Sequence, residues 1–491
     1  MQRRWWILAA VSLATFMTYL DNNVTNVAIP TIQRSLHLSI AGLEWVVSGY
    51  ILVFASMLLA GGRLADIYGR RRLLLVGLSI FTLSSLGAGL ATSGGVLIAA
   101  RLLQGLGAAL MVPTTLAIII ATFTDTRQRT RAIATWTAIG GLALAFGPLI
   151  GGFITQHLHW GWIFFINLPI GAITFAIAIP AVPESRDTSA ARRLDIPGLI
   201  TSAVSMFALT YALIEGHDKG WTSPLILAAF GLAAAAAGAF GLVESRTPHP
   251  MVDMSLFRSR VFSGGTTMMM LWAFGILGIY FFTSIYLQTI LGFSPTKAGL
   301  AFVPMAICMA VFASLAPQVA PRLGTHRTVG IGMALMAAGL YLFARLGGGA
   351  TFASLMPGFL LFGAGAGLMN VPLTNAVLHS MPPERSGVAS ALLNASRELA
   401  GLLGITVIGA VLRARQGEAL HHGASAGAAF LNGYHDGLLL TVVLLVAGAV
   451  LGWVALRGSA ADHAVPNLEA TVAEELAPEP APELVRASSS D

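Results

Sequence analysis

The chain has 491 residues, of which 56% are hydrophobic and only 10% are charged, and its formal net charge is +6. Soluble domains carry about 25% charged residues, so most of this chain cannot be a soluble, fibrous or disordered protein, and a polytopic membrane protein is indicated. The basic residues are dispersed between apolar runs, which argues against a nucleic-acid partner. The single cysteine, Cys308, excludes a disulfide framework and a cysteine zinc site.

Fourteen apolar runs are long enough to cross a bilayer, which takes roughly 20 residues. Arg3 and Arg4 before the first run are typical of a signal peptide, but no convincing cleavage site follows, so we expect an uncleaved first span. The predicted spans are 7–29, 44–64, 73–92, 95–121, 131–155, 161–182, 196–215, 222–243, 261–288, 297–319, 328–345, 351–379, 387–411 and 436–456.

The distribution of basic residues predicts the orientation of the chain. With a cytoplasmic N-terminus and alternating spans, cytoplasmic segments hold 20 arginines and outer segments hold 6 Lys or Arg. Cytoplasmic loops are enriched in Lys and Arg, so both termini are expected in the cytoplasm. Residues 413–435 are then a long outer loop, and the acidic, Ala-Pro-rich residues 458–491 are a disordered tail.

An internal repeat divides the chain. Residues 65–72 align with 320–327 at an offset of 255, Gly77 falls on Gly332, and 105–113 resembles 363–372 with one extra residue. We therefore predict an N-terminal six-helix half over 1–190, two linking helices over 191–250, and a C-terminal six-helix half over 251–457. Duplicated halves around a midplane site are typical of secondary transporters. The sequence lacks a phosphate-binding loop, which favours an ion gradient over ATP as the energy source.

Four motifs then carry a resemblance to a known family. The loop Gly62-Arg-Leu-Ala-Asp-Ile-Tyr-Gly-Arg-Arg-Arg72 resembles the signature loop of the major facilitator superfamily. Three further stretches resemble its fourteen-span drug:proton antiporter family, although Asn23 replaces a usual Thr and Ala143 replaces a usual Gly. These stretches are Leu20–Pro30 in the first span, Arg101–Gly107 in the fourth and Gly147–Gly152 in the fifth. The resemblance implies an all-α fold of fourteen transmembrane helices, with two helices linking the six-helix halves.

The signature loop must turn tightly between two spans. Gly62 and Gly69 permit backbone angles and close approaches that side chains forbid, and Asp66 lies among several arginines. The acid can cap a helix or bridge to an arginine. The resemblance implies that Gly62, Arg63, Asp66, Gly69, Arg70 and Arg71 latch the two halves in one access state. The alternative, plain topogenic charge, explains the arginines but not the acid and the two glycines.

Asp21 is an ionisable residue within a span, which makes it a functional candidate by default. The rise along each helix puts Asp21 and Arg101 at similar depths, so they could pair or share a cavity. Burial favours a neutral carboxyl group and a nearby Arg favours a charged one, so this acid could take up and release protons. Arg101 does not deprotonate and would tune or anchor the acid. The alternative is a structural knot of Asp21 with Asn22, Asn23 and Asn26.

Glu398 is the other acid predicted well inside a span, near the midplane and next to Arg397. It could contact a cationic substrate, bind a proton, or pair with a neighbouring arginine. Gly147, Pro148, Gly151 and Gly152 favour a bendable helix that packs closely. The resemblance implies that these residues seal a leak during antiport, whereas ordinary glycine packing is the alternative.

Two further patterns favour structural roles. Residues 268–286 are rich in Met and aromatic side chains, which suit a promiscuous pocket but more often fill a core. His421, His422 and His435 lack regular ligand spacing, so we expect no metal site, and no cofactor is indicated.

These observations predict a monomeric transporter, not an enzyme, in the bacterial plasma membrane. It would export lipophilic drugs or antibiotics in exchange for protons by alternating access. One alternative is a proton-coupled symporter or facilitator for a small polar nutrient, against which only the fifth-span motif argues. Another is a membrane sensor or scaffold, which would be expected to carry an added soluble domain.

Overall fold

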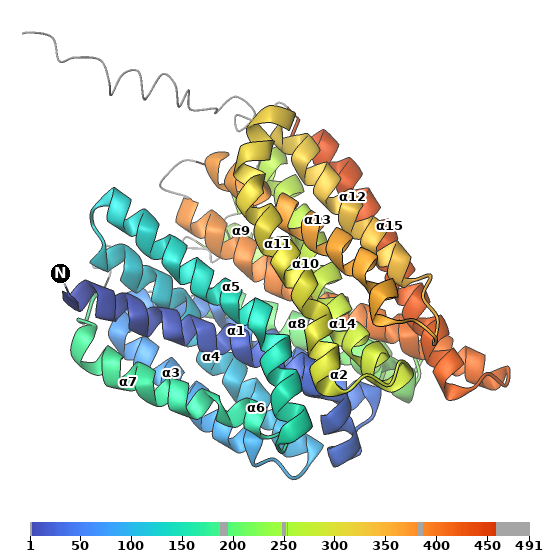
Figure 1. The fold of residues 1–491 in the computed structure, drawn as a ribbon. Helices are drawn as coiled ribbons and strands as arrows, with labels where there is room; N and C mark the ends of the chain where they lie inside the picture. Colours follow the sequence, from blue (N-terminus) through green and yellow to red (C-terminus); the bar gives the residue numbers. More distant parts are fainter. Residues whose placement is uncertain (1, 187–194, 248–251, 253, 382–385, 458–491) are drawn as a thin grey trace, which may run out of the picture.

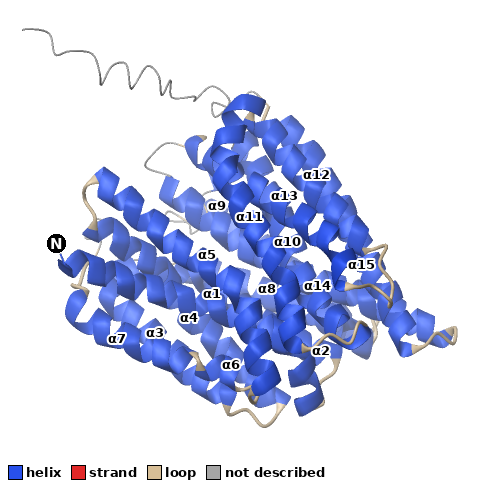
Figure 2. Ribbon diagram, viewed as in Figure 1, coloured by secondary structure: helices blue, strands red, loops and turns tan. Residues whose placement is uncertain are grey.

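The computed structural model describes residues 2–186, 195–247, 252, 254–381 and 386–457. Within these ranges every regular element is helical, as the composition predicts (Figure 2). The first half comprises α1 (Gln2–Leu36), α2 (Ile40–Tyr68), α3 (Arg70–Gly89), α4 (Gly94–Thr122), α5 (Thr126–His157), α6 (Trp162–Phe165) and α7 (Asn167–Ala181). The linking helices are α8 (Ile196–Lys219) and α9 (Pro224–Arg246). After η1 (Met254–Arg258), the second half comprises α10 (Arg260–Ile285) with the π-helical turn η2 (Tyr286–Ile290), α11 (Pro295–Leu323), α12 (Thr325–Phe343), α13 (Phe352–His379), α14 (Ser386–His421) and α15 (Ala426–Ala455).

Local sequence explains where these helices begin. Ser39, Ser93 and Ser223 each stand before a helix, and each hydroxyl accepts a hydrogen bond from a backbone N–H in the first turn. Such caps satisfy backbone donors that a helix leaves free at its N-terminus. The apolar runs that follow need no other signal, because a helix satisfies its own backbone bonds in lipid.

Twelve helices of the described chain are long and apolar enough to cross a membrane, with α6 and α7 together forming one of them. The two remaining long helices are α1 and α12. The polar stretch of α1 from Asp21 to Asn26 lowers its hydropathy, and α12 is short and begins with Thr-His-Arg. The count of fourteen spans therefore stays a prediction, although all fourteen predicted runs fall on helical segments.

The predicted long outer loop over 413–435 is wrong. The helix α14 continues to His421 and α15 begins at Ala426, so only residues 422–425 connect them. Hydropathy ends a span at Arg413, but this side chain is 5% exposed and is paired inside the protein. The predicted domain boundaries at 190 and 250 and the tail over 458–491 lie outside the described residues.

The internal repeat appears as matching contacts. The turn from α2 to α3 passes through Gly69 with φ +115°, and the turn from α11 to α12 passes through Gly324 with φ +85°. A Cβ atom on Gly77 would lie 2.7 Å from the Gly107 carbonyl oxygen, and one on Gly332 would lie 2.8 Å from the Gly365 carbonyl oxygen. Equivalent glycines thus let α3 approach α4 and α12 approach α13.

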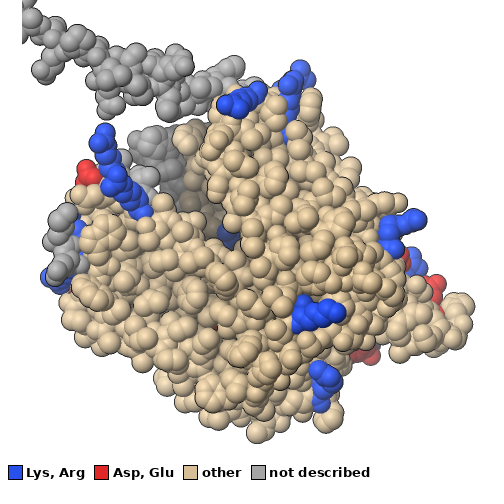
Figure 3. All heavy atoms as spheres, viewed as in Figure 1, with Lys and Arg blue, Asp and Glu red and all other residues tan. Residues whose placement is uncertain are grey.

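The two halves lie side by side, with α1–α7 in blue to green and α10–α15 in yellow to red (Figure 1). We call the end of the bundle that holds residue 2 and the α2–α3 turn the N-terminal face. The opposite end, which holds the α1–α2, α3–α4 and α14–α15 turns, is the far face. A hollow opens between the halves toward the N-terminal face, and a broad belt of the visible surface carries no Lys, Arg, Asp or Glu (Figure 3).

Candidate functional site

Asp21 lies completely buried on α1, at the centre of a polar cluster in the first half. Arg101 of α4 pairs with it, since Nη1 donates to Asp21 Oδ2. Two amides donate to the other carboxylate oxygen: Gln104 Nε2 at 3.1 Å and Asn167 Nδ2 at 2.8 Å. Every one of these partners is a donor, so the arrangement suits the ionised carboxylate.

Arg101 is held by more than the carboxylate. Its Nε donates to the Val46 carbonyl oxygen at 3.0 Å, and Nη1 also donates to Gln104 Oε1 at 2.9 Å. The ring of Tyr50 lies 4.4 Å from the guanidinium carbon, a cation–π distance. A buried charge is tolerated only when it is paired and hydrogen-bonded, and this guanidinium meets both conditions.

Ser85 of α3 completes the cluster. Its hydroxyl oxygen accepts from Gln104 Nε2 at 2.8 Å and from Asn167 Nδ2 at 3.3 Å. The hydroxyl itself donates to the Phe81 carbonyl oxygen at 2.7 Å. Five helices (α1, α2, α3, α4 and α7) thus meet at one hydrogen-bond network. A change in the charge of the Asp21 carboxylate would therefore alter contacts of most helices in the first half.

The sequence interpretation named Arg101 as a possible partner of Asp21 but missed three members of this cluster. Gln104, Asn167 and Ser85 were not predicted as site residues. Gln104 lies three residues after Arg101, a spacing that puts both on one helix face, and Asn167 interrupts an apolar run. The asparagines adjoining Asp21 are not its partners in the described chain, since Asn23, for example, donates to the Tyr19 carbonyl oxygen at 2.7 Å.

Glu398 lies on α14 of the second half and is 8% exposed. Arg397 Nη2 donates to Glu398 Oε1 at 2.8 Å, and the same nitrogen lies 3.4 Å from the Tyr19 hydroxyl oxygen on α1. This ion pair therefore contacts the first half two residues before Asp21. Of the alternatives for Glu398, pairing with an arginine is the one the geometry shows.

The signature loop is anchored to the end of α7. Arg70 donates to Asp66 Oδ1 from Nη2 at 2.8 Å and from Nε at 3.2 Å. Arg71 Nη2 donates to the Ile179 carbonyl oxygen at 2.6 Å, and its backbone N–H donates to Glu184 Oε1 at 3.1 Å. These contacts lie within the first half. A latch between the halves stays a prediction.

Glycine is required at Gly69 of this loop and at the preceding Gly61 of α2, whereas the close approach predicted at Gly62 is wrong. A Cβ atom on Gly69 would lie 2.5 Å from Glu184 Oε1, and its φ is +115°. A Cβ atom on Gly62 would lie 3.5 Å from Pro113, which is an ordinary contact. The close approach is at Gly61, which faces the Ala109 carbonyl oxygen of α4, because the face of α2 that meets α4 is one residue earlier. Arg63 is half-buried on α2.

The fifth-span glycines bring α5 against α1. A Cβ atom on Gly147 would lie 2.5 Å from Asn23 Cβ, and one on Gly151 would lie 2.6 Å from the Val24 carbonyl oxygen. Neither distance is compatible with a side chain. The motif therefore packs directly on the turn of α1 that follows Asp21.

The same motif also joins the two halves near the far face. A Cβ atom on Gly152 would collide with the Pro295 carbonyl oxygen of α11, and one on Gly299 of α11 would collide with the Pro148 carbonyl oxygen. The Thr296 backbone N–H donates to Gln156 Oε1 at 3.1 Å. These contacts close the interface between α5 and α11 without space for a side chain.

The Met-rich and aromatic stretch of α10 fills the interior of the second half. Tyr280 stacks on Phe302 with ring centroids 4.9 Å apart, and Tyr286 stacks on Tyr434 at 5.1 Å. His435 Nε2 lies 2.7 Å from the Leu346 carbonyl oxygen. Among the described residues no group of His, Cys, Asp and Glu is suited to hold a metal ion. These residues act as packing groups.

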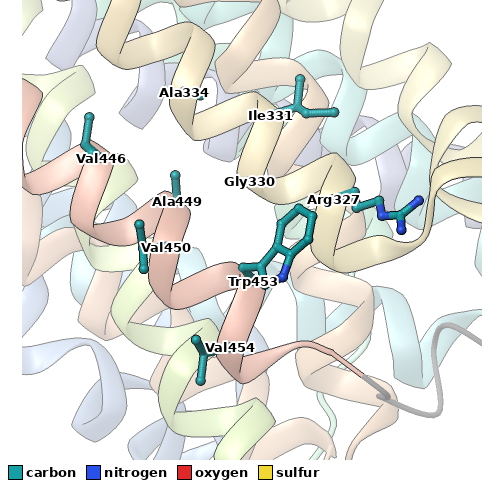
Figure 4. A pocket seen from close by; sticks show the side chains of 9 residues that line it. All are labelled: Arg327, Gly330, Ile331, Ala334, Val446, Ala449, Val450, Trp453 and Val454. Atoms are coloured by element: carbon teal, nitrogen blue, oxygen red, sulfur yellow. The ribbon is translucent and has the colours of Figure 1, made fainter.

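A groove of about 490 Å³ lies between α12 and α15, on the outside of the second half (Figure 4). Figure 4 shows Trp453 and Arg327 at one end and small or branched aliphatic residues along the rest. It contains no predicted site residue. Its lining residues are Arg327, Gly330, Ile331, Ala334, Val446, Ala449, Val450, Trp453 and Val454.

Comparison with known proteins agrees with this architecture. The profile of the Major Facilitator Superfamily matches residues 11–405. The chain belongs to the major facilitator superfamily. It is therefore a multi-pass membrane transporter rather than an enzyme.

Several relatives align with most of the chain. It is 35% identical over 472 residues to the puromycin resistance protein pur8 of Streptomyces alboniger, covering 94% of this chain and 93% of the relative. It is 36% identical to the multidrug resistance protein Stp of Mycobacterium tuberculosis (strain CDC 1551 / Oshkosh), covering 83% and 75%. It is 33% identical to the tetracenomycin C resistance and export protein of Streptomyces glaucescens, covering 85% and 77%.

Solved structures share the fold. A bacterial homologue of the human lysosomal transporter Spinster superposes with a TM-score of 0.66 at 18% identity, covering 94% of this chain and 98% of the other. An auto-inhibited POT family peptide transporter gives a TM-score of 0.66 at 16% identity, covering 93% and 97%.

Proposed function

We propose that this superfamily member exports lipophilic drugs or antibiotics across the bacterial plasma membrane in exchange for protons. The carrying observation is the fully buried carboxylate of Asp21, paired with Arg101 and surrounded by amide donors. The names of three relatives support the substrate class, since they refer to puromycin, multidrug and tetracenomycin C resistance. The fifth-span motif favours this antiporter over a nutrient symporter.

Protonation of Asp21 would change its network, because a neutral acid must donate one hydrogen bond. All its present side-chain partners donate to it, so none of them offers the acceptor that the new O–H group needs. Asn167 Oδ1 is buried without a partner among the described residues, so rotation of that amide would offer the acceptor that a protonated Asp21 needs. Proton uptake and rearrangement at the α1–α7 contact are coupled in this scheme.

The difference between the two faces supports alternating access. The hollow opens toward the N-terminal face (Figure 3), whereas α5 and α11 meet near the far face. We assign the N-terminal face to the cytoplasm, so this conformation would load substrate from inside. In the other state the halves would pivot, and the signature loop of Gly62, Arg63, Asp66, Gly69, Arg70 and Arg71 would hold the cytoplasmic face closed. Glu398, beside Arg397 at the contact with α1, would bind a cationic substrate or a second proton.

We also propose that the chain crosses the membrane fourteen times, with α8 and α9 as the two helices that link the predicted halves. The helix α1 has 35 residues, long enough to cross, and its polar stretch is buried against α4, α5 and α7 rather than exposed to lipid. The helix α12 packs between α13 and α15, and both of these neighbours are long and apolar enough to cross a membrane. With α1 and α12 counted as spans, the number of spans is even and both termini are placed in the cytoplasm. We expect the transporter to work as a monomer.

A dye-accumulation assay tests the proposal. Cells that carry the wild-type protein should hold less of a lipophilic fluorescent dye than control cells, and a protonophore should abolish the difference. Asp21→Asn should abolish it too, because the amide cannot exchange a proton. Glu418→Gln is the matched control, since this acid is exposed and pairs only with Arg415 of its own helix in the described chain. Full export by Asp21→Asn would exclude the coupling role, and uptake of a polar nutrient would favour the symporter.

A further inference from the structure

A second buried ion pair joins the two halves near the far face. Arg413 of α14 donates from Nη1 to Oε1 of Glu44, which lies in the second turn of α2. The Glu44 side chain is completely buried and that of Arg413 is 5% exposed. The sequence interpretation placed Arg413 in an outer loop and did not select Glu44. The two residues are 369 positions apart along the chain, yet they are in direct contact.

The linking helix α8 holds this pair from the side. Arg413 Nη2 donates to the carbonyl oxygens of Leu213 at 3.2 Å and Ile214 at 3.0 Å, near the C-terminal end of α8. These backbone carbonyl oxygens are acceptors that help to satisfy the buried guanidinium. Trp45, next to Glu44, donates from Nε1 to Glu215 Oε1 of α8 at 3.0 Å. Thus α8 is bonded to both α2 and α14 at one level of the bundle.

The Glu44 carboxylate also packs against the backbone of α14 at Gly409. A Cβ atom on Gly409 would collide with Glu44 Oε1, so only glycine leaves room for the carboxylate there. The other oxygen, Oε2, is buried and has no partner in the part of the chain that the structure describes. Separation of α2 from α14 would leave two charges without partners unless water reached both, so the pair favours a closed interface.

We propose that Glu44 and Arg413 form an ionic lock that keeps the far face closed, with α8 as a strap across α2 and α14. The lock acts at a different helix pair from the glycine contact of α5 with α11. It rests on the alternating-access part of the proposed function, because opening of the far face must separate α2 and α14. It also gives the linking helices a role, since α8 supplies two of the three acceptors that hold Arg413.

Distance measurements between spin labels test the lock without any substrate. In a chain carrying Cys308→Ser, labels at Thr92→Cys, between α3 and α4, and Gly349→Cys, between α12 and α13, report the separation of the halves at the far face. In lipid nanodiscs, Glu44→Gln should add a population at longer distance that the wild type lacks. Glu418→Gln, which removes an exposed charge within α14, should leave the distances unchanged.

Two further variants separate the lock from simple damage. Gly409→Ala keeps both charges but displaces the carboxylate, and it should lengthen the distance in the same way even where Glu44→Gln does not assemble. Glu44→Gln combined with Arg413→Gln should lengthen it no more than the stronger single change, because both act on one pair.

Wild-type distances in Glu44→Gln and Gly409→Ala would overturn the lock. That result would leave dye export by the wild type intact. Conversely, longer distances together with a wild type that exports no dye would keep the lock and remove the export proposal.

Discussion

Two Arg–carboxylate pairs are buried on both sides in the part of the chain that the structure describes, and their surroundings differ. Asp21 has donors on both oxygens, so its charge is balanced entirely within the first half. Glu44 has one bonded oxygen and its partner comes from the second half. A pair within a rigid half is suited to storing a proton, whereas a pair between halves is suited to sensing their separation.

The Asp21–Arg101 pair predicts a specific pattern of stability. Asp21→Asn and Arg101→Gln should each lower the unfolding free energy by about 3 kcal/mol, because each leaves one buried charge unpaired. The double variant should be less destabilised than the sum of the two, since no lone charge remains. Thermal unfolding of the purified proteins in detergent measures this. Strict additivity would show that the two side chains do not form a pair in the folded protein.

At the scale of elements, α5 is the helix that connects the candidate site to the far face. Its glycines contact α1 just after Asp21 on one side and α11 of the second half on the other. A displacement of α1 on proton uptake would therefore be passed by α5 to the interface between the halves. At both contacts the backbones touch directly, because glycine leaves no side chain between them. Packed helices transmit such shifts because their interiors are incompressible.

Gly152→Ala tests this contact. The added Cβ collides with the Pro295 carbonyl oxygen, and overpacking of this kind costs about 1–3 kcal/mol. The closed far face should then become less populated by about fivefold or more, with a faster proton leak into liposomes and weaker dye export. Gly141→Ala on the same helix is the control, because a Cβ there meets nothing within 4 Å. An unchanged leak in Gly152→Ala would remove the sealing role from the motif.

For the whole molecule, the charge pattern and the fold agree on a membrane-embedded bundle. The visible surface carries an uncharged belt (Figure 3). Large apolar side chains such as Leu83, Val450 and Phe153 are exposed. Exposed apolar surface of this extent is favourable only against lipid. The arginine bias predicts which end faces the cytoplasm, and the hollow then faces the same side.

Labelling of single cysteines tests both the orientation of the chain and whether α12 crosses the membrane. In the Cys308→Ser background, Gly349→Cys at the far face should react with a membrane-impermeant maleimide added outside intact cells. Leu323→Cys, at the end of α11 and two residues before α12 begins, should react only after the cells are opened. Labelling of both from outside would show that α12 does not cross, and the reverse pattern would invert the predicted topology.

Prediction from the sequence worked where neighbouring residues carry the information. The turn at Gly69 and its repeat at Gly324, and the close contacts of Gly147 and Gly151, follow local motifs and appear in the structure. The glycine requirement at Gly62 was off by one position, because the face that α2 turns toward α4 depends on packing. The loop over 413–435 was misplaced because hydropathy counts Arg413 as exposed, and its burial depends on a carboxylate 369 residues away.

The sequence by itself determined that this is a helical membrane protein with duplicated halves, because hydropathy, charge bias and repeated motifs are properties of short segments. It also singled out Asp21 and Arg101, since charges within apolar runs are conspicuous. Only the tertiary structure decided that Gln104, Asn167 and Ser85 surround Asp21 and that Glu44 meets Arg413. Those contacts join helices far apart along the chain, and their geometry is set by how whole helices pack rather than by any local pattern.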